Sequence, residues 1–452
     1  MNDLTEGPVS GHVVRMAVPI AIGMVFQTLY YLVDLYFVGR LGEAALAGLG
    51  TAGNLQFLVM ALTQVLGVGT MALIAHASGR KDRDDANLIF NQSLGLAAVC
   101  AAFTLVGGYA AVGGYMRLLG ADAATRAAGT TYLHWFLPGL GLQFALISMG
   151  AALRGTGIVR PTIAVQVFTV VLNAVLSPIM IAGWGTGRPL GVMGAGLSTS
   201  VSVAVGVALM ALYFHRLERY VALDRSQLRP RAEVWSRILK VGLPPGGEFA
   251  LLFVYMGVIY WAIRDFGAAA QAGFGIGNRV MQAFFLPAMA IAFATAPVAG
   301  QNMGAGLPDR VRATFRWSAL TLSAVMVGLT LICRWRPELF IGAFTEDPEV
   351  IRMGSEFIAI VSLNFIASGI VFTCSGMFQA LGNTVPSLAA SASRLLTFGV
   401  PAAWLTTVPW FELHHLWYTS VLSVTLQAGV AWWLLSGEMR RRLPGLAPAG
   451  QP

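Results

Sequence analysis

The chain has few charged residues for its length. Only 11% of its 452 residues are Asp, Glu, Lys or Arg, whereas a typical soluble domain carries about 25%. Hydrophobic residues make up 56% of the chain, and the mean hydropathy is +0.69. A soluble protein of this length needs charged exteriors on two or three domains. The composition therefore excludes the ordinary soluble classes and indicates a membrane protein.

Several functional signatures are also missing. The three cysteines lie in apolar stretches, without metal-ligand spacing and without an even set for disulfides, so we expect them to be packing residues. The sequence has no nucleotide-binding loop, no zinc-protease motif and no nucleophile elbow. We therefore predict that the protein is not an enzyme and holds neither a metal nor an organic cofactor. Residues 1–14 are polar and contain no signal-peptide core.

The excess of basic residues does not indicate a nucleic-acid partner. The formal net charge is +8, but the Lys and Arg residues lie in short clusters between apolar segments, where the positive-inside rule expects them. No basic face interleaved with aromatic residues is present. The partners that we expect are the lipid bilayer and small organic molecules, with the chain acting as a monomer.

Twelve apolar segments are long enough to cross a bilayer, which takes roughly 20 residues each. They are 15–38, 46–75, 93–116, 130–152, 161–183, 190–213, 241–263, 273–300, 317–340, 357–380, 386–408 and 416–436. Most of the 29 basic residues fall in the connections that become cytoplasmic if the N-terminus is inside. We predict a multi-pass protein of the cell inner (plasma) membrane with both termini in the cytoplasm.

The two halves of the chain repeat each other at one fixed offset. Pro19 and Gly42 match Pro244 and Gly267 in the second half, and further pairs follow without an insertion. These are Gly48 with Gly273, Gly129 with Gly354, Gly157 with Gly382, and Pro161 with Pro386. Proline and glycine mark kinks and close backbone approaches, so their collinear pairing indicates a duplication.

The predicted fold is therefore an all-α membrane protein with about twelve transmembrane helices. Because each copy has six spans, both insert in the same direction, as parallel repeats around a central cleft. We predict an N-lobe at 1–213, a cytoplasmic connecting loop at 214–240, a C-lobe at 241–440 and a cytoplasmic tail at 441–452. Transporters use this arrangement, and a duplicated scaffold without transport is the alternative.

Only two of the 21 acidic residues fall well inside a span, Asp34 and Glu248. A carboxylate at that depth costs about 2.5–3.5 kcal/mol on insertion scales. Gln27 and Tyr30 share one helical face with Asp34. We predict that this polar face is a site that couples transport to H⁺ or Na⁺, and a static hydrogen bond between helices is the alternative.

Three further polar residues are candidates for the same chemistry. Glu248 follows a Pro-Pro-Gly-Gly run, and Arg279 in the next span is its expected counter-ion. The pair is either a secondary cation site or a structural latch. Asn173 is a mid-span amide, which either ties two helices together or shares a polar cavity with Asp34.

Four motifs resemble the multidrug and toxic compound extrusion (MATE) family. They are VDLYFVGRLG in the first span, ALRGTGIVRP at 152–161, GQNMGAG at 300–306 and FQALGNTVP at 378–386. The resemblance covers about residues 10 to 436. It implies two six-helix lobes and an antiporter that exports amphipathic, often cationic organic compounds by alternating access. It also implies that Asp34 is the proton- or cation-responsive residue and that Glu248 corresponds to the seventh-span glutamate of the family.

The sequence departs from two branches of that family. Residues 357–380 contain no acid to accompany Glu248, and Ser177 stands where one branch has an aspartate four residues after Asn173. The resemblance is therefore nearest to the proton-coupled branch that is similar to DNA-damage-inducible proteins. Two other functions compete with drug:H⁺ or drug:Na⁺ antiport. One is a lipid-linked precursor flippase of the wider superfamily, and the other is a non-transporting membrane scaffold.

Overall fold

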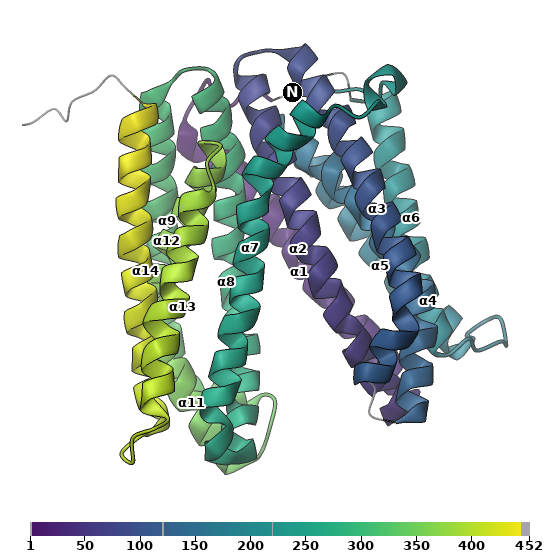
Figure 1. Cartoon of the computed structure of the whole chain (residues 1–452), viewed down its shortest axis with the longest axis vertical. Coiled ribbons are helices and arrows are strands. Elements are labelled where there is room, and N and C mark those ends of the chain that lie inside the picture. Colours follow the sequence, from purple (N-terminus) through teal and green to yellow (C-terminus); the bar gives the residue numbers. More distant parts are fainter. Residues whose placement is uncertain (1, 120–121, 219, 444–452) are drawn as a thin grey trace, which may run out of the picture. The chain divides into compact units, whose positions relative to one another are not determined.

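The structure is a computed structural model. It describes residues 2–119, 122–218 and 220–443, without the side chains of residues 30–35, 44, 46, 51, 54 and 119. Within these ranges the chain is helical and has no β-strand (Figure 1). Its contacts divide it into unit 1, Met1–Asp3 with Ile22–Leu243, and unit 2, Leu4–Ala21 with Pro244–Pro452.

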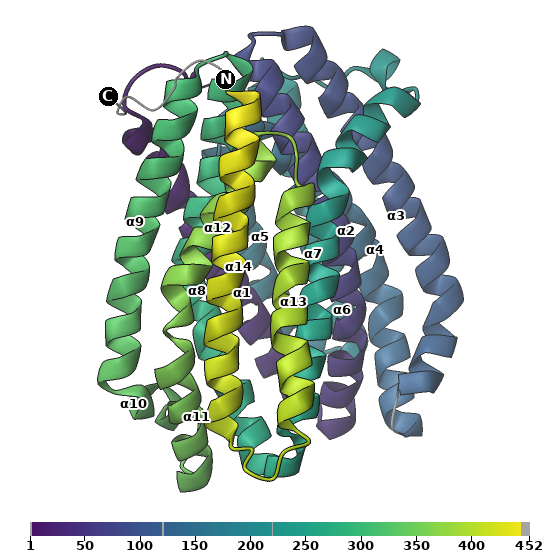
Figure 2. The ribbon, with the colours of Figure 1, turned by 60° about the vertical axis from the view of Figure 1, so that its left-hand side comes forward.

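Five helices lie wholly in unit 1, and seven lie wholly in unit 2 (Figure 1). Those of unit 1 are α2 (Glu43–Gly79), α3 (Arg83–Leu119), α4 (Ala123–Gly155), α5 (Arg160–Ala182) and α6 (Val192–Arg216). Those of unit 2 are α8 (Gly267–Gly304), α9 (Pro308–Trp335), α10 (Pro337–Gly342), α11 (Pro348–Val361), α12 (Asn364–Ala380), α13 (Val385–Leu405) and α14 (Leu413–Arg442). Figure 2 shows α13 and α14 side by side within unit 2.

The remaining two long helices contribute to both units. The helix α1 (Val9–Gly39) enters unit 1 at Ile22, and α7 (Ala232–Ile263) enters unit 2 at Pro244. Both changes occur at or near a proline, Pro19 in α1 and Pro244 in α7, and these two prolines match in the sequence repeat. A proline inside a helix removes a backbone hydrogen bond and favours a bend.

The helices agree with the twelve predicted spans. Among the described residues, nine segments are long and apolar enough to cross a membrane. One of them contains both α7 and α8, which the short 3₁₀ helix η2 (Arg264–Phe266) joins. The bent pair α11–α12 forms another span, and the 21-residue α13 completes the twelve.

The structure differs from the sequence prediction in two predicted spans and in the predicted connecting loop. The predicted span 357–380 is not one helix, because α11 and α12 meet at a 53° bend. The predicted span 317–340 is divided between α9 and α10. The predicted loop 214–240 contains a 3₁₀ helix, η1 (Arg225–Leu228), and the first residues of α7, and contacts place it with unit 1. The predicted tail lies outside the described residues from 444 onward.

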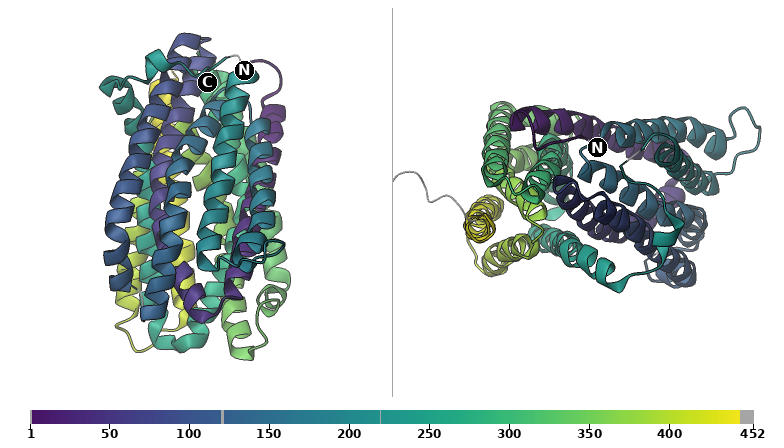
Figure 3. Two further views of the ribbon diagram at one scale, coloured as in Figure 1. Left: turned by 90° about the vertical axis from the view of Figure 1, so that its right-hand side faces the viewer. Right: turned by 90° about the horizontal axis from the view of Figure 1, so that it is seen from above.

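Each unit contains one pair of corresponding glycines at which two helices approach closely. A Cβ atom added to Gly48 of α2 would lie 2.7 Å from the nitrogen of Gly129 in α4. In unit 2, a Cβ atom on Gly273 of α8 would lie 2.8 Å from the nitrogen of Gly354 in α11. Both pairs correspond through the repeat, so the duplicated glycines permit the same close helix–helix approach in each unit. Figure 3, on the right, shows the helices of each unit end-on.

Candidate functional site

The part of α1 that belongs to unit 1 packs against α5. Gly23 lies so close to α5 that an added Cβ atom would be 2.8 Å from both Ile163 and Gln166. One turn later, the Gln166 side chain donates a hydrogen bond of 3.2 Å to the exposed Gln27 amide oxygen. The sequence-predicted Gln27 is therefore a polar contact between α1 and α5.

Two of the sequence-predicted residues lie outside the described side chains. These are Tyr30 and Asp34, which follow Gln27 in α1. Further along the helix, the Phe37 ring packs edge-on against Trp184 in the loop after α5, with 6.1 Å between the ring centroids.

Asn173 belongs to a buried polar cluster between α5 and α6. Its amide nitrogen lies 3.5 Å from the hydroxyl oxygens of Ser198 and Thr199, and its amide oxygen accepts a hydrogen bond of 3.3 Å from Ser177. Asn173, Ser177 and Ser198 are all fully buried. These contacts tie the two helices together, which favours the packing role that the sequence left open for Asn173.

Glu248 and Arg279 do not pair. Glu248 is half-buried, and its Oε1 accepts no hydrogen bond from the described residues. The neighbouring polar group is the Ser387 hydroxyl on α13. Arg279 is exposed on α8, and no described carboxylate forms an ion pair with it. The described part of unit 2 therefore contains no ion pair between the two residues, the contact on which the latch alternative depends.

Sequence reasoning missed a polar cluster in unit 2. Arg394 of α13 lies over the ring of Tyr255 on α7, with its guanidinium carbon 4.0 Å from the ring centroid. The Tyr255 hydroxyl lies 2.9 Å from Ser420 of α14, which also accepts a hydrogen bond from Asn364 of α12. The available signal was a lone arginine in the middle of the predicted span 386–408.

No metal centre emerges from the described residues. No group of three or more His, Cys, Asp or Glu side chains in them could hold an ion. Cys333 and Cys374 are buried, Cys100 is half-buried, and all three are free thiols.

Sequence comparison identifies the family. The MatE family profile matches residues 19–179 and 244–405, once in each half of the chain. A probable multidrug resistance protein NorM of Thermotoga maritima is 27% identical over 442 residues, which cover 95% of this chain and 93% of the relative. An FAD transporter of Shewanella oneidensis is 24% identical over 410 residues, and the match covers 89% of each chain.

Solved structures have the same fold. An outward-facing multidrug resistance MATE transporter of the MOP superfamily superimposes with a TM-score of 0.90 at 23% identity, over 98% of each chain. A MOP superfamily transporter from Pyrococcus furiosus, whose structure is described as having a binding pocket of reverse polarity, gives the same TM-score at 24% identity over 98% of each chain. These likenesses show two six-helix lobes.

The matching proteins are named as transporters and not as enzymes, as the sequence predicted. Their family profile covers the spans of both lobes. The chain belongs to the MatE family of multidrug and toxic compound extrusion transporters.

Proposed function

We propose that the protein is a secondary antiporter that exports amphipathic organic compounds in exchange for H⁺. Na⁺ is the alternative coupling ion, and organic cations are the substrates that the sequence favours. Substrate would cross by alternating access, with bending of α1 near Pro19 and of α7 at Pro244, where each helix passes from one unit to the other. Both termini would lie in the cytoplasm, and the protein would act as a monomer in the inner membrane.

The contact between Gln27 and Gln166 is the observation that supports a coupling site on α1. Asp34 follows Gln27 by seven residues, and Asn173 follows Gln166 by seven. The first and fifth spans run in the same direction in the predicted topology, so equal spacings from one contact correspond to equal depth. A carboxyl at that depth, on the polar face of α1, is suited to take up and release a proton.

The two lobes differ in the acidic residues that could couple transport to an ion. Unit 2 has no acidic partner for Glu248 on α11 or α12 within the predicted span 357–380, so a two-carboxylate Na⁺ site is not available there. Glu248 also has no positive counterpart at Arg279. We therefore assign the principal coupling role to Asp34 and a secondary role to Glu248.

The experiment is dye efflux from proteoliposomes under separate H⁺ and Na⁺ gradients. The test substrate is the ethyl ester of rhodamine B, an amphipathic cation. We expect a pH gradient to drive efflux by the wild-type protein. The efflux rate of the Asp34→Asn variant should be at least about tenfold lower. The matched control is Glu248→Gln, the other intramembrane carboxyl, which should keep most of the rate.

Two results would contradict this proposal. Efflux that responds to Na⁺ alone would overturn the choice of ion. Full pH-driven efflux by Asp34→Asn, with the variant inserted and folded as judged by its size-exclusion profile, would overturn the role of Asp34.

A further inference from the structure

Arg394 is a cation in the middle of a span without an anion beside it. It is the tenth residue of the 21-residue α13, about 13 Å from the start of the helix. Its side chain is half-buried, and its Nε is buried without a hydrogen-bond acceptor among the described residues. No described carboxylate forms an ion pair with it. A lone guanidinium at this depth is costly, and such residues generally mark a functional site.

The contact with Tyr255 leaves the N–H groups at the edge of the Arg394 guanidinium available to a ligand. The guanidinium carbon of Arg394 lies over the tyrosine ring, 4.0 Å from its centroid, and this cation–π interaction partly compensates the charge. The N–H groups of a guanidinium lie along its edge, in its own plane, and this edge is the part that grips a carboxylate or a phosphate with two parallel hydrogen bonds. In the described structure the edge is without such a partner.

The described groups that contact Tyr255 and Ser420 carry no negative charge. The Tyr255 hydroxyl and the Asn364 amide both reach the Ser420 hydroxyl, at 2.9 and 3.2 Å. The Asn364 amide nitrogen already donates to Ser420, and its buried amide oxygen, which accepts no hydrogen bond from the described residues, is an acceptor and does not bind an anion. The Phe398 ring packs against the Tyr255 ring, with 4.7 Å between the ring centroids.

The break between α11 and α12 adds a further positive element. Asn364 is the first residue of α12, and the two helices meet there at 53°. The N-terminus of α12 therefore begins inside the span and beside this cluster. The backbone N–H groups of Ser362, Leu363 and Phe365 are already hydrogen bonded to preceding carbonyls, so this end adds only the partial positive charge of the helix dipole and no free donors.

The one carboxyl group of this region lies at a different level. Glu248 precedes Tyr255 by two turns on α7, and its neighbour Ser387 precedes Arg394 by two turns on α13. Its charge is therefore about 10 Å along the helix axis from the level of the guanidinium. At the level of Arg394, the described groups are the cation, the hydroxyls, the amide and the aromatic rings.

We propose that Arg394, held against Tyr255, forms a subsite for a carboxylate or phosphate group on an aromatic substrate. This inference rests on the transport function proposed above and extends its substrates from organic cations to aromatic zwitterions and anions. Arg394 binds the anionic group through its edge, and Tyr255 holds the guanidinium in place. The anionic group belongs to a transported molecule, and a lipid headgroup is the other source that the experiment distinguishes.

The test uses two dyes that differ in one charge. Rhodamine B carries a free carboxylate, and its ethyl ester has the same fluorophore without it. Binding to the full-length protein in nanodiscs of neutral phosphatidylcholine is followed by fluorescence anisotropy, so that no ion gradient is needed. We expect Arg394→Gln to weaken binding of rhodamine B at least about tenfold and to change binding of the ester by less than about twofold. Arg394→Lys should be intermediate for rhodamine B, because it keeps the charge and loses the two-pronged edge.

A second variant tests the site with the arginine in place. Ser391 lies one turn before Arg394 on α13, so Ser391→Asp brings a tethered carboxylate next to the guanidinium. This variant should also lose rhodamine B binding while it keeps the ester. The matched control is Leu396→Ala, which shortens an exposed side chain of the same helix and should keep binding of both dyes within about twofold.

Three results would overturn the proposal. The first is equal loss of both dyes in Arg394→Gln and in Ser391→Asp, which would indicate a general packing effect. The second is unchanged rhodamine B binding in both variants. The third is Arg394-dependent binding of rhodamine B that appears only when anionic phosphatidylglycerol replaces part of the neutral lipid, which would assign Arg394 to the lipid. Wild-type protein that binds both dyes but shows no gradient-driven efflux would contradict the proposed transport function alone.

Discussion

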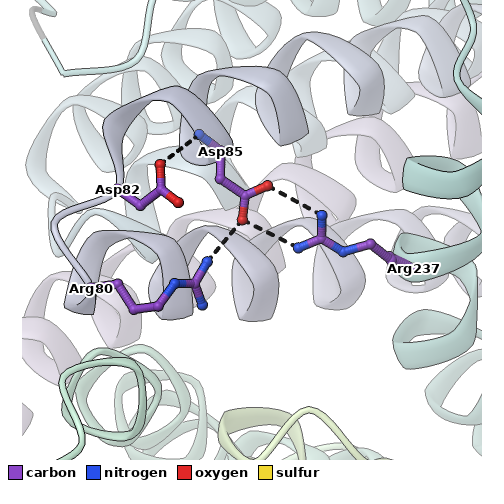
Figure 4. Close-up of polar contacts among 4 residues, drawn as sticks. All are labelled: Arg80, Asp82, Asp85 and Arg237. Atoms are coloured by element: carbon purple, nitrogen blue, oxygen red, sulfur yellow. Dashed lines mark hydrogen bonds and ion pairs between the residues drawn. The ribbon is translucent and has the colours of Figure 1, made fainter.

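Asp85 of α3 accepts a hydrogen bond of 3.2 Å from each of the two terminal nitrogens of Arg237 in α7 (Figure 4). Arg80, the residue after α2, donates to the same carboxylate at 2.9 Å, and the Asp85 backbone nitrogen donates to Asp82. The first part of α7 is thereby attached to the end of unit 1 where α2 turns into α3. The sequence predicted a connecting loop there.

We expect Asp85 and Arg237 to be energetically coupled. The pair is only partly enclosed, with side-chain exposures of 18% and 45%, so a coupling energy of about 0.5–1 kcal/mol is expected. The measurement is a double-mutant cycle with Asp85→Asn and Arg237→Gln, read from the unfolding of the purified protein. If the losses of unfolding free energy in the two single variants add up to the loss in the double variant, the coupling between Asp85 and Arg237 is contradicted. Asp309→Asn, which removes an exposed partner of Arg312 on α9, should change the stability little.

Gly242 should be intolerant of even one added carbon. A Cβ atom there would lie 1.8 Å from the Val65 carbonyl oxygen of α2. Because the Cβ atom and the carbonyl oxygen are both fixed by the backbone, no side-chain rotation can relieve the clash. We expect Gly242→Ala to destabilise the protein by at least about 1–3 kcal/mol. The matched control is Gly257→Ala in the same helix, where a Cβ atom meets nothing within 4 Å. It should be neutral or slightly stabilising, and thermal unfolding compares the two variants.

The segment that joins the units should resist proteolysis because α3 holds it. The Gln92 side chain accepts a hydrogen bond of 2.8 Å from the Arg231 nitrogen and donates one of 2.7 Å to the Arg229 oxygen. Asn91 accepts one of 2.9 Å from the Asp224 nitrogen. We expect Gln92→Ala to increase trypsin cleavage between residues 225 and 231 roughly tenfold, because local opening exposes the backbone.

The control for this experiment is Gln271→Ala, an exposed glutamine on α8. It should digest like the wild-type protein. Equal cleavage of the wild-type and Gln92→Ala proteins would show that the hydrogen bonds seen in the structure do not restrain the segment in solution.

The start of α4 should respond to acid through one aspartate. Asp122 caps the helix by accepting a hydrogen bond of 2.7 Å from the Thr125 nitrogen, and this bond holds the pKa of the carboxyl below its usual range. Stability from this charge is therefore present above the unfolded pKa of about 3.9 and is lost as the pH falls through the lower folded pKa. We expect Asp122→Ala to melt at a lower temperature than the wild type at pH 7, and the difference to shrink at pH 3. Asp122→Asn, which can still accept the bond, should lie closer to the wild type at pH 7.

The number of spans and the duplication could be predicted from the sequence because both depend on local properties. A run of about 20 apolar residues spans a bilayer whatever its neighbours are, and prolines and glycines report backbone geometry residue by residue. The pairing of Gly48 with Gly129, and of Gly273 with Gly354, confirms the repeat as contacts. The candidate Asp34 was also visible locally, as an acid inside an apolar run.

Only the tertiary structure decided how these elements are joined. The sequence placed 1–21 with the N-lobe, yet Leu4 and Asn302 are hydrogen bonded in unit 2. The bend before Asn364 and the stacking of Arg394 on Tyr255 were likewise not predictable. The contacts of Leu4 with Asn302 and of Arg394 with Tyr255 join residues more than 100 positions apart in the chain, and apolar length and helical period carry no information about such contacts. The apolar pattern of the sequence therefore determined the spans, while packing between distant segments decided where the charged and polar groups meet.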